Sequence, residues 1–179
     1  MAQRMIRMTS LKLLNPALLA ATLLTIGTAS ANPYFSVVDP GTLGIFGHSM
    51  GGHGALTLAL RHPDVYRSVS AFAPIAAPSL CPWGEKAFGG YLGADRQVWR
   101  EHDASTLVED GRRCPPILID QGMSDPFLPT QLNPDRFEQV CADGQPLALR
   151  RHAGYDHGYY FISTFMADHL AHHAQYLKA

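Results

Sequence analysis

After the turn Asp39-Pro40-Gly41, short apolar runs alternate along the chain with longer segments of helical character. The short runs predict four strands, at Leu43–Phe46, Ser68–Phe72, Ile117–Asp120 and Leu147–Arg151. The longer segments predict four helices, at Gly52–Arg61, Arg96–Val108, Pro134–Ala142 and Tyr159–Leu177. The segment Ala77–Gly93, which is interrupted by glycine and proline, is expected to be irregular. Strands that alternate with helices are typical of βαβ units, so the pattern predicts an α/β fold with a parallel sheet and flanking helices.

The pentapeptide Gly47-His48-Ser49-Met50-Gly51 lies between the first predicted strand and the first predicted helix. It is a G-x-S-x-G sequence, which forces a sharp strand-to-helix turn and lifts the serine hydroxyl above the end of a sheet. The glycines are needed because a Cβ atom at their positions would collide with the neighbouring strand or helix. The apolar strand before the motif and the helix after it supply the context that this motif requires.

A serine hydroxyl is a poor nucleophile at neutral pH and needs an adjacent base, which is oriented in turn by an acid. In a fold with this motif, the acid and then the histidine follow later strands of the sheet. Asp125 follows the third predicted strand, and His157 follows the fourth. The sequence therefore predicts Ser49 as nucleophile, His157 as base and Asp125 as the group that orients His157, with the backbone N–H of Met50 as an oxyanion donor.

Each of these residues has a simpler interpretation. Asp125 could cap a turn, and His157 could be an ordinary loop histidine with its hydrogen bonds satisfied. Asp120 and Asp156 compete for the role of the acid, but Asp120 is placed at a strand end and Asp156 directly adjoins the histidine in the chain. The order and spacing of the three residues together favour the triad over the separate interpretations.

The bulk composition narrows the classes of partner. The chain has 179 residues, 46% of them hydrophobic, and a net charge of −1, which is ordinary for one globular domain. No basic surface indicates nucleic acid, and no run of like charge indicates a membrane-facing patch. The three cysteines, at positions 81, 114 and 141, predict neither a zinc site nor a disulfide scaffold, and their odd number suits a reducing compartment.

Two further groups of residues carry candidate chemistry. His169, His172 and His173 have a spacing that could hold a metal, but no glutamate accompanies them, so a solvated helix face is the preferred interpretation. Cys81 has no neighbouring base to activate it, which favours a buried structural role. The sequence therefore predicts no metal and no cofactor.

The first 31 residues contain two arginines, an apolar stretch from Ala17 to Ile26 and the small-residue site Ala29-Ser30-Ala31. This arrangement has the features of a secretory signal peptide, and the alternative is an accidental apolar leader. The apolar stretch is too short, and too broken by Gly27, to form a stable membrane span.

From Asp39 to its C-terminus, the chain resembles the S-formylglutathione hydrolase family, also known as esterase D. The resemblance rests on the segment Gly47–Leu56, on Ser68–Ile75, on Pro82-Trp83-Gly84, on Asp120-Gln121-Gly122, on Gly154–His157 and on Tyr159–Phe161. One small departure is Gly158, where the family usually has serine.

The resemblance implies an α/β-hydrolase fold and hydrolysis of S-formylglutathione to glutathione and formate, a step in the detoxification of formaldehyde. It implies the same triad of Ser49, Asp125 and His157 and a side activity on short-chain acyl esters. Members of the family are cytosolic and often homodimeric, so the resemblance also implies a cytoplasmic location. A cleavable leader at residues 1–31 would instead indicate an exported esterase of the same fold.

The large departure lies at the front of the chain, where Met1–Val38 does not resemble the first half of the family's domain. The expected organisation is therefore a leader at residues 1–31 and the C-terminal half of an α/β-hydrolase domain at residues 39–179, without the N-terminal strands. In such a domain the strand Leu43–Phe46 would present an apolar edge, and one oxyanion donor would be missing, at a cost of about 10²–10³ in turnover. Besides an S-formylglutathione hydrolase and an exported esterase, a catalytically silent fragment is therefore the third hypothesis.

Overall fold

Four parallel strands form the sheet in the computed structural model, which describes residues 43–177. They pair in the order β1-β2-β3-β4, with bounds of β1 Leu43–His48, β2 Tyr66–Phe72, β3 Ile117–Gly122 and β4 Leu147–His152. The parallel α/β prediction is confirmed. The first and third strands run two residues further than the sequence indicated, and these added residues carry the backbone up to the candidate catalytic loops.

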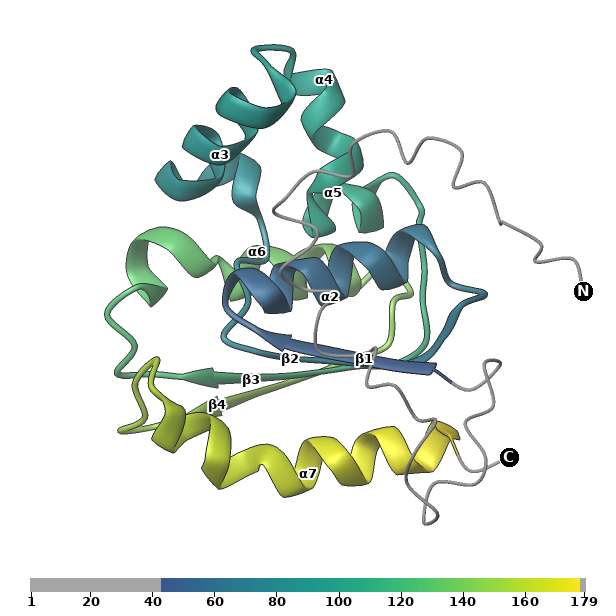
Figure 1. Ribbon diagram of the computed structural model, residues 1–179, viewed down its shortest axis with the longest axis vertical. Helices are drawn as coiled ribbons and strands as arrows, with labels where there is room; N and C mark the ends of the chain where they lie inside the picture. The colour runs from purple at the N-terminus through teal and green to yellow at the C-terminus, as the bar shows by residue number, and fades with distance from the viewer. Residues whose placement is uncertain (1–42, 178–179) are drawn as a thin grey trace, which may run out of the picture.

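Helices cover both faces of the sheet (Figure 1). One face carries α2 Met50–Arg61, α5 Ala104–Glu109 and α6 Pro134–Cys141. The other face carries the 19-residue helix α7 Tyr159–Leu177. Above the first layer stand α3 Pro82–Leu92 and α4 Arg96–Trp99. Three more short helical segments lie at Pro78–Leu80, Arg100–His102 and Leu128–Leu132.

The face under α2 is packed with aliphatic side chains. Leu56 and Leu60 of α2 are fully buried, and Ile119 of β3 is almost so. These residues share one cluster with Val69 and Phe137. Their spacing on α2 and their alternation along the strands create one continuous apolar layer, which supplies the main hydrophobic stabilisation of this half of the molecule.

The segment Ala77–Gly93 is helical where the sequence predicted an irregular excursion. Within it, α3 begins with Pro82 at its first position and Cys81 as its N-cap, whose sulfur accepts a hydrogen bond from the N–H of Gly84. The glycines of α3 lower its intrinsic helix propensity, but Gly84 is required by packing. A Cβ atom there would lie 2.0 Å from the carbonyl oxygen of Pro78. Tertiary contact thus overrides the local preference.

The predicted helix Arg96–Val108 is instead three short segments. Helix α4 ends at Trp99, a 3₁₀ turn follows at Arg100–His102, and α5 begins after Asp103. The carboxylate of Asp103 accepts hydrogen bonds from the N–H groups of Ser105 and Thr106, which is the geometry of an N-cap. Because an N-cap residue has non-helical backbone angles, Asp103 starts a new helix and ends the preceding turn.

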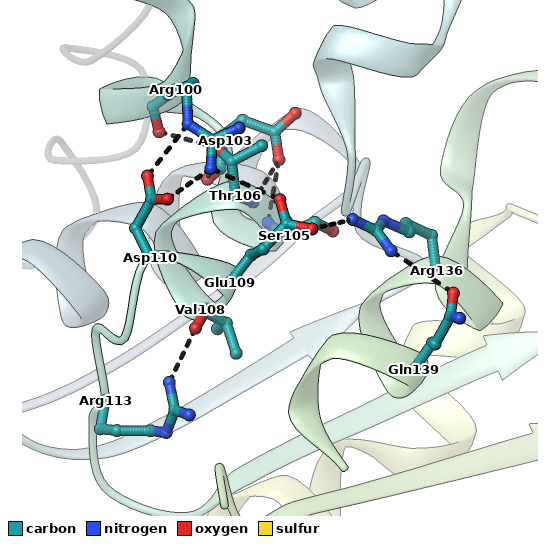
Figure 2. A network of polar contacts seen from close by, with 10 residues as sticks. All are labelled: Arg100, Asp103, Ser105, Thr106, Val108, Glu109, Asp110, Arg113, Arg136 and Gln139. Atoms are coloured by element: carbon teal, nitrogen blue, oxygen red, sulfur yellow. Dashed lines mark hydrogen bonds and ion pairs between the residues drawn. The ribbon is translucent and has the colours of Figure 1, made fainter. Parts of the chain in front are cut away.

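A network of ion pairs joins these segments on the surface (Figure 2). Arg100 binds Glu109 and Asp110, and Arg136 of α6 binds Glu109 from the other side at 2.7 Å. The participating side chains are 30–47% exposed, so each pair contributes about 0–1 kcal/mol.

The predicted leader at residues 1–31 and the predicted domain start at residue 39 lie outside the described residues. Within residues 43–177, strand β1 stands at one end of the sheet order, with Leu43 and Phe46 more than a third exposed. None of the helices in this range combines the length and the hydropathy that a bilayer crossing requires.

Candidate active site

Ser49 occupies the turn between β1 and α2 in a strained backbone conformation. Its φ is 54° and its ψ is −117°, a region that residues with a side chain rarely adopt. The turn is fixed on both sides: the N–H of Ser49 donates to the carbonyl of Phe72 at 2.9 Å, and the carbonyl of Ser49 accepts from His53 at 2.9 Å. The predicted sharp strand-to-helix turn is therefore present, and the surrounding hydrogen bonds maintain its strained backbone conformation.

Two glycines make the turn sterically feasible. A Cβ atom at Gly47 would lie 2.3 Å from the carbonyl oxygen of Gly51, and one at Gly52 would lie 3.0 Å from the side chain of Pro74. At Gly51 the space is open. The first glycine of the motif is thus needed by the turn itself, while Gly52 allows α2 to approach the loop that follows β2.

Asp125 and His157, 32 residues apart in the chain, are hydrogen-bonded to each other. The distance from Nδ1 of His157 to Oδ2 of Asp125 is 2.5 Å. The side chain of Asp125 is fully buried, and that of His157 is 15% exposed. A buried carboxylate against one ring nitrogen fixes the orientation and tautomer of an imidazole and leaves the other nitrogen to exchange a proton.

The loops after β3 and β4 bring this pair together. The N–H of Ser124 donates to the carbonyl of Tyr155 at 2.9 Å, which ties one loop to the other. The second oxygen of the Asp125 carboxylate accepts from the N–H of Phe127 at 2.8 Å, and Nε2 of Gln121 lies 3.4 Å from the first. The carboxylate is therefore held by the backbone of its own loop and by the end of β3.

The His157 ring lies close to the serine turn. It is 4.3 Å from the ring of His48, the residue before Ser49, and 5.0 Å from the ring of Phe127, which meets it edge-on at 85°. Among the described residues, no hydrogen bond joins the Ser49 hydroxyl to His157. Such bonds are often long in sites without ligand and tighten in the complex with substrate.

The competing carboxylates have other partners. Asp120 is fully buried on β3 and binds Arg150, His152 and His169. Asp156 accepts a hydrogen bond from the N–H of Gly158 at 2.8 Å, as a turn residue does. Of the three candidate acids, Asp125 is the one that binds the His157 ring.

A cavity of about 340 Å³ opens beside Ser49, between α2 and α3. Its walls are mainly apolar and include Met50, Leu58, Ile75, Trp83, Phe88 and Tyr91. His53 also lines it, and burial lowers the pKa of its imidazole to about 4, so this ring is neutral near pH 7. The sequence pattern does not indicate this cavity, because three of its aromatic side chains lie on α3, a helix that the pattern did not predict. The Pro82 that begins α3 was the available signal.

The sequence predicted that the three histidines of α7 form a solvated face, and this prediction is wrong. His169 and His173 are buried, and they bind Ser68, Ser70 and Asp120 on the sheet. Residues 43–177 contain no cluster of side chains with the geometry of a metal site. Cys81 is buried and is not in a disulfide, in agreement with its predicted structural role, and burial raises the pKa of its thiol.

Comparison with known proteins identifies the family. Residues 33–172 match the family model described as "Putative esterase". The chain is 57% identical over 146 residues to the S-formylglutathione hydrolase of Rattus norvegicus and 54% identical to that of Arabidopsis thaliana; the two matches cover 79% and 80% of this chain and 51% of each relative. The structure of an S-formylglutathione hydrolase from Agrobacterium tumefaciens superposes with a TM-score of 0.76 at 56% identity, over 78% of this chain and 51% of that one.

The chain therefore spans about half the length of the curated relatives that it matches. The matched half includes the serine turn, the sheet described above and both loops that carry the Asp125–His157 pair. The fold and the sequence together show that this chain belongs to the esterase family, with S-formylglutathione hydrolases among its relatives.

Proposed function

We propose that the chain is a serine hydrolase that cleaves S-formylglutathione to glutathione and formate, with a side activity on short-chain acyl esters. The observation that carries the proposal is the 2.5 Å contact between Asp125 and His157, placed beside the strained turn that presents Ser49. The names of the relatives supply the substrate class. We assign Ser49 as nucleophile, His157 as general base and acid, and Asp125 as the residue that orients His157.

In the first half of the reaction, the Ser49 hydroxyl oxygen attacks the formyl carbon while Nε2 of His157 takes the hydroxyl proton. The carbon–sulfur bond then breaks, and His157 returns the proton to the leaving thiolate of glutathione. In the second half, water attacks the formyl ester on Ser49, again with proton transfer through His157, and formate leaves. No cofactor enters either step.

The negative charge that develops on the substrate oxygen needs hydrogen-bond donors. The backbone N–H of Met50 lies at the first position of α2, where an N–H group has no partner within the helix and the helix dipole favours negative charge. We assign this N–H as one oxyanion donor. The adjacent cavity presents mainly apolar walls to one side of the reacting group.

Hydrolysis of S-formylglutathione by the purified chain, beside its Ser49→Ala variant, tests the proposal. Loss of the nucleophile is expected to lower kcat by at least about 10³-fold, because the hydroxyl forms the covalent intermediate. Ser163→Ala is the matched control, since Ser163 is exposed on α7 and its hydroxyl binds only the carbonyl of Tyr160. Equal turnover in Ser49→Ala and the unaltered chain, or turnover in neither, would overturn the proposal.

The proposals for assembly and location rest on the resemblance to the S-formylglutathione hydrolase family. We propose a small-molecule substrate, a homodimer as the assembly and a cytoplasmic location, with export through residues 1–31 as the alternative. Sedimentation of the purified chain measures the assembly. Mass spectrometry of the N-terminus from the expressing cell separates the two locations, because export would remove the first 31 residues.

A further inference from the structure

His48 lies on the α7 side of β1, at the carboxyl end of the strand. Side chains two residues apart in a strand share a face. A Cβ atom at Gly44 would meet His173 of α7, and the ring of Phe46 lies 5.8 Å from the ring of the same histidine. His48 is two residues after Phe46 in β1, so its side chain lies on the same face as Gly44 and Phe46. The loop after β4 carries His157 to this face.

The rings of His48 and Phe127 contact the imidazole of His157. The ring of His48 lies 4.3 Å away at a tilt of 47°, and that of Phe127 lies 5.0 Å away, edge-on. Asp125 holds Nδ1 of the same imidazole. The bond to Asp125 fixes which ring nitrogen carries the proton, and contacts with the faces and edges of the ring add to the restraint on its side-chain torsions and thus on the direction of Nε2.

We propose that His48 is a positioning residue for the hydrolysis, and that its ring holds the imidazole of His157 in the orientation from which Nε2 reaches Ser49. His48 is not among the residues that line the cavity beside Ser49, and its ring contacts His157, so it would act through His157. This inference rests on the triad assigned above, and it adds a residue whose role does not follow from the G-x-S-x-G pattern, in which the second position is variable.

The charge state of His48 fits this role. Burial, and then the electrostatic effect of neighbouring His157, lowers the pKa of His48, while Asp125 and the backbone of His157 raise it to a smaller extent. The ring of His48 is therefore neutral near pH 7. A neutral ring does not repel the imidazolium that forms when His157 accepts the serine proton, whereas a fixed cation at this position would do so.

Two substitutions test whether an aromatic ring at position 48 is what holds His157 in place. His48→Ala removes the contact and is expected to lower kcat about 10- to 100-fold with KM unchanged within about twofold, because misplacing a catalytic group affects the chemical step. His48→Phe keeps a ring at the same place and is expected to retain at least about a third of kcat. Phe46→Ala is the matched control, since Phe46 lies on the same face of β1 and contacts α7.

A spectroscopic measurement tests the same inference without turnover. The proton on Nδ1 of His157, bonded to Asp125, is expected to give a low-field NMR signal, and its rate of exchange with water would report how firmly the ring is held. We expect faster exchange in His48→Ala and exchange like that of the unaltered chain in His48→Phe and Phe46→Ala. Unchanged exchange and kcat in His48→Ala, or an equal loss in Phe46→Ala, would overturn the inference. An unaltered chain without turnover would contradict the proposed function, and the exchange rates would still decide the role of His48.

Discussion

The two faces of the sheet are built on different physical principles. The face under α2 is closed by aliphatic side chains such as Leu56, Val69 and Ile119. The face under α7 holds a buried chain of hydrogen bonds that passes from Ser68 through the two buried histidines and Ser70 to Asp120. One layer therefore tolerates changes that conserve volume, while the other requires each polar atom to keep its partner.

The polar layer ends in an ion cluster around Asp120. Nε and Nη2 of Arg150 each donate to the carboxylate at 2.6 Å, and Nη1 of the same arginine reaches Asp168 of α7 at 2.7 Å. Burial alone would raise the pKa of the Asp120 carboxyl, but hydrogen bonds from His169, Arg150 and His152 outweigh it and hold that pKa well below its usual range. The helix α7 is thus attached to the sheet by charge and hydrogen bonds as well as by apolar contact.

The largest difference in stability between the two faces is expected at two neighbouring residues of β3 that face opposite layers. Asp120→Asn conserves volume but removes the charge that Arg150 and two histidines share, and it is expected to lower the free energy of unfolding by about 3 kcal/mol or more. Ile119→Leu conserves volume on the apolar side and is expected to cost less than about 1.5 kcal/mol. Urea unfolding of the two variants measures the difference, and equal costs would show that the two faces do not differ in this way.

The second effect is a dependence of stability on pH that comes from the polar layer. Burial is the main cause that lowers the pKa of His173 to about 4, below the ordinary value of 6.5. The unfolded chain therefore binds this proton more readily between these two values, and stability falls as pH drops from about 6.5 toward 4, by about 1.4 kcal/mol for each pH unit. Asp120, with its lowered pKa, adds to the loss only at still lower pH.

Unfolding curves of the unaltered chain and of His173→Gln at pH 7 and pH 5 measure this contribution. The variant is expected to lose less stability between the two pH values. The pKa of His53 is lowered in both proteins, so the contribution of His53 cancels in the difference. Parallel losses in the two proteins would show that His173 does not couple folding to pH.

The smallest effect is expected outside both layers, in the surface network of Figure 2. Arg136→Gln removes the ion pair with Glu109, whose side chain is 43% exposed, and is expected to change the free energy of unfolding by less than about 1 kcal/mol. The remaining effect is expected to shrink in 1 M salt, because screening weakens exposed pairs. A loss above about 2 kcal/mol would place this network with the buried polar layer.

The sequence predicted the parts of the molecule in which local pattern and tertiary packing agree. Strand β1, the turn at Ser49 and the helix α7 are encoded by an apolar run, by glycines at fixed spacing and by a helical period, and each was found. The pairing of Asp125 with His157 was a prediction from chain order, and the structure places the two side chains in contact. Their catalytic roles stay proposals until turnover is measured.

The errors lie where distant parts of the chain decide the outcome. The glycines of α3 predict irregular structure by propensity, yet Gly84 belongs to a helix because it packs against Pro78. His169 and His173 have the spacing of a solvated face, yet they are buried because polar residues on β2 and β3 supply hydrogen-bond partners. A pattern along one helix cannot show whether the facing strand is apolar or polar.

The sequence by itself determined the class of fold, the alternation of strands and helices, and the strained serine turn. Each of these depends on residues close together in the chain. Only the tertiary structure decided which rings surround His157 and which histidines are buried. These outcomes depend on contacts between side chains about 30 to 110 residues apart, and such contacts form only after the sheet has aligned its strands.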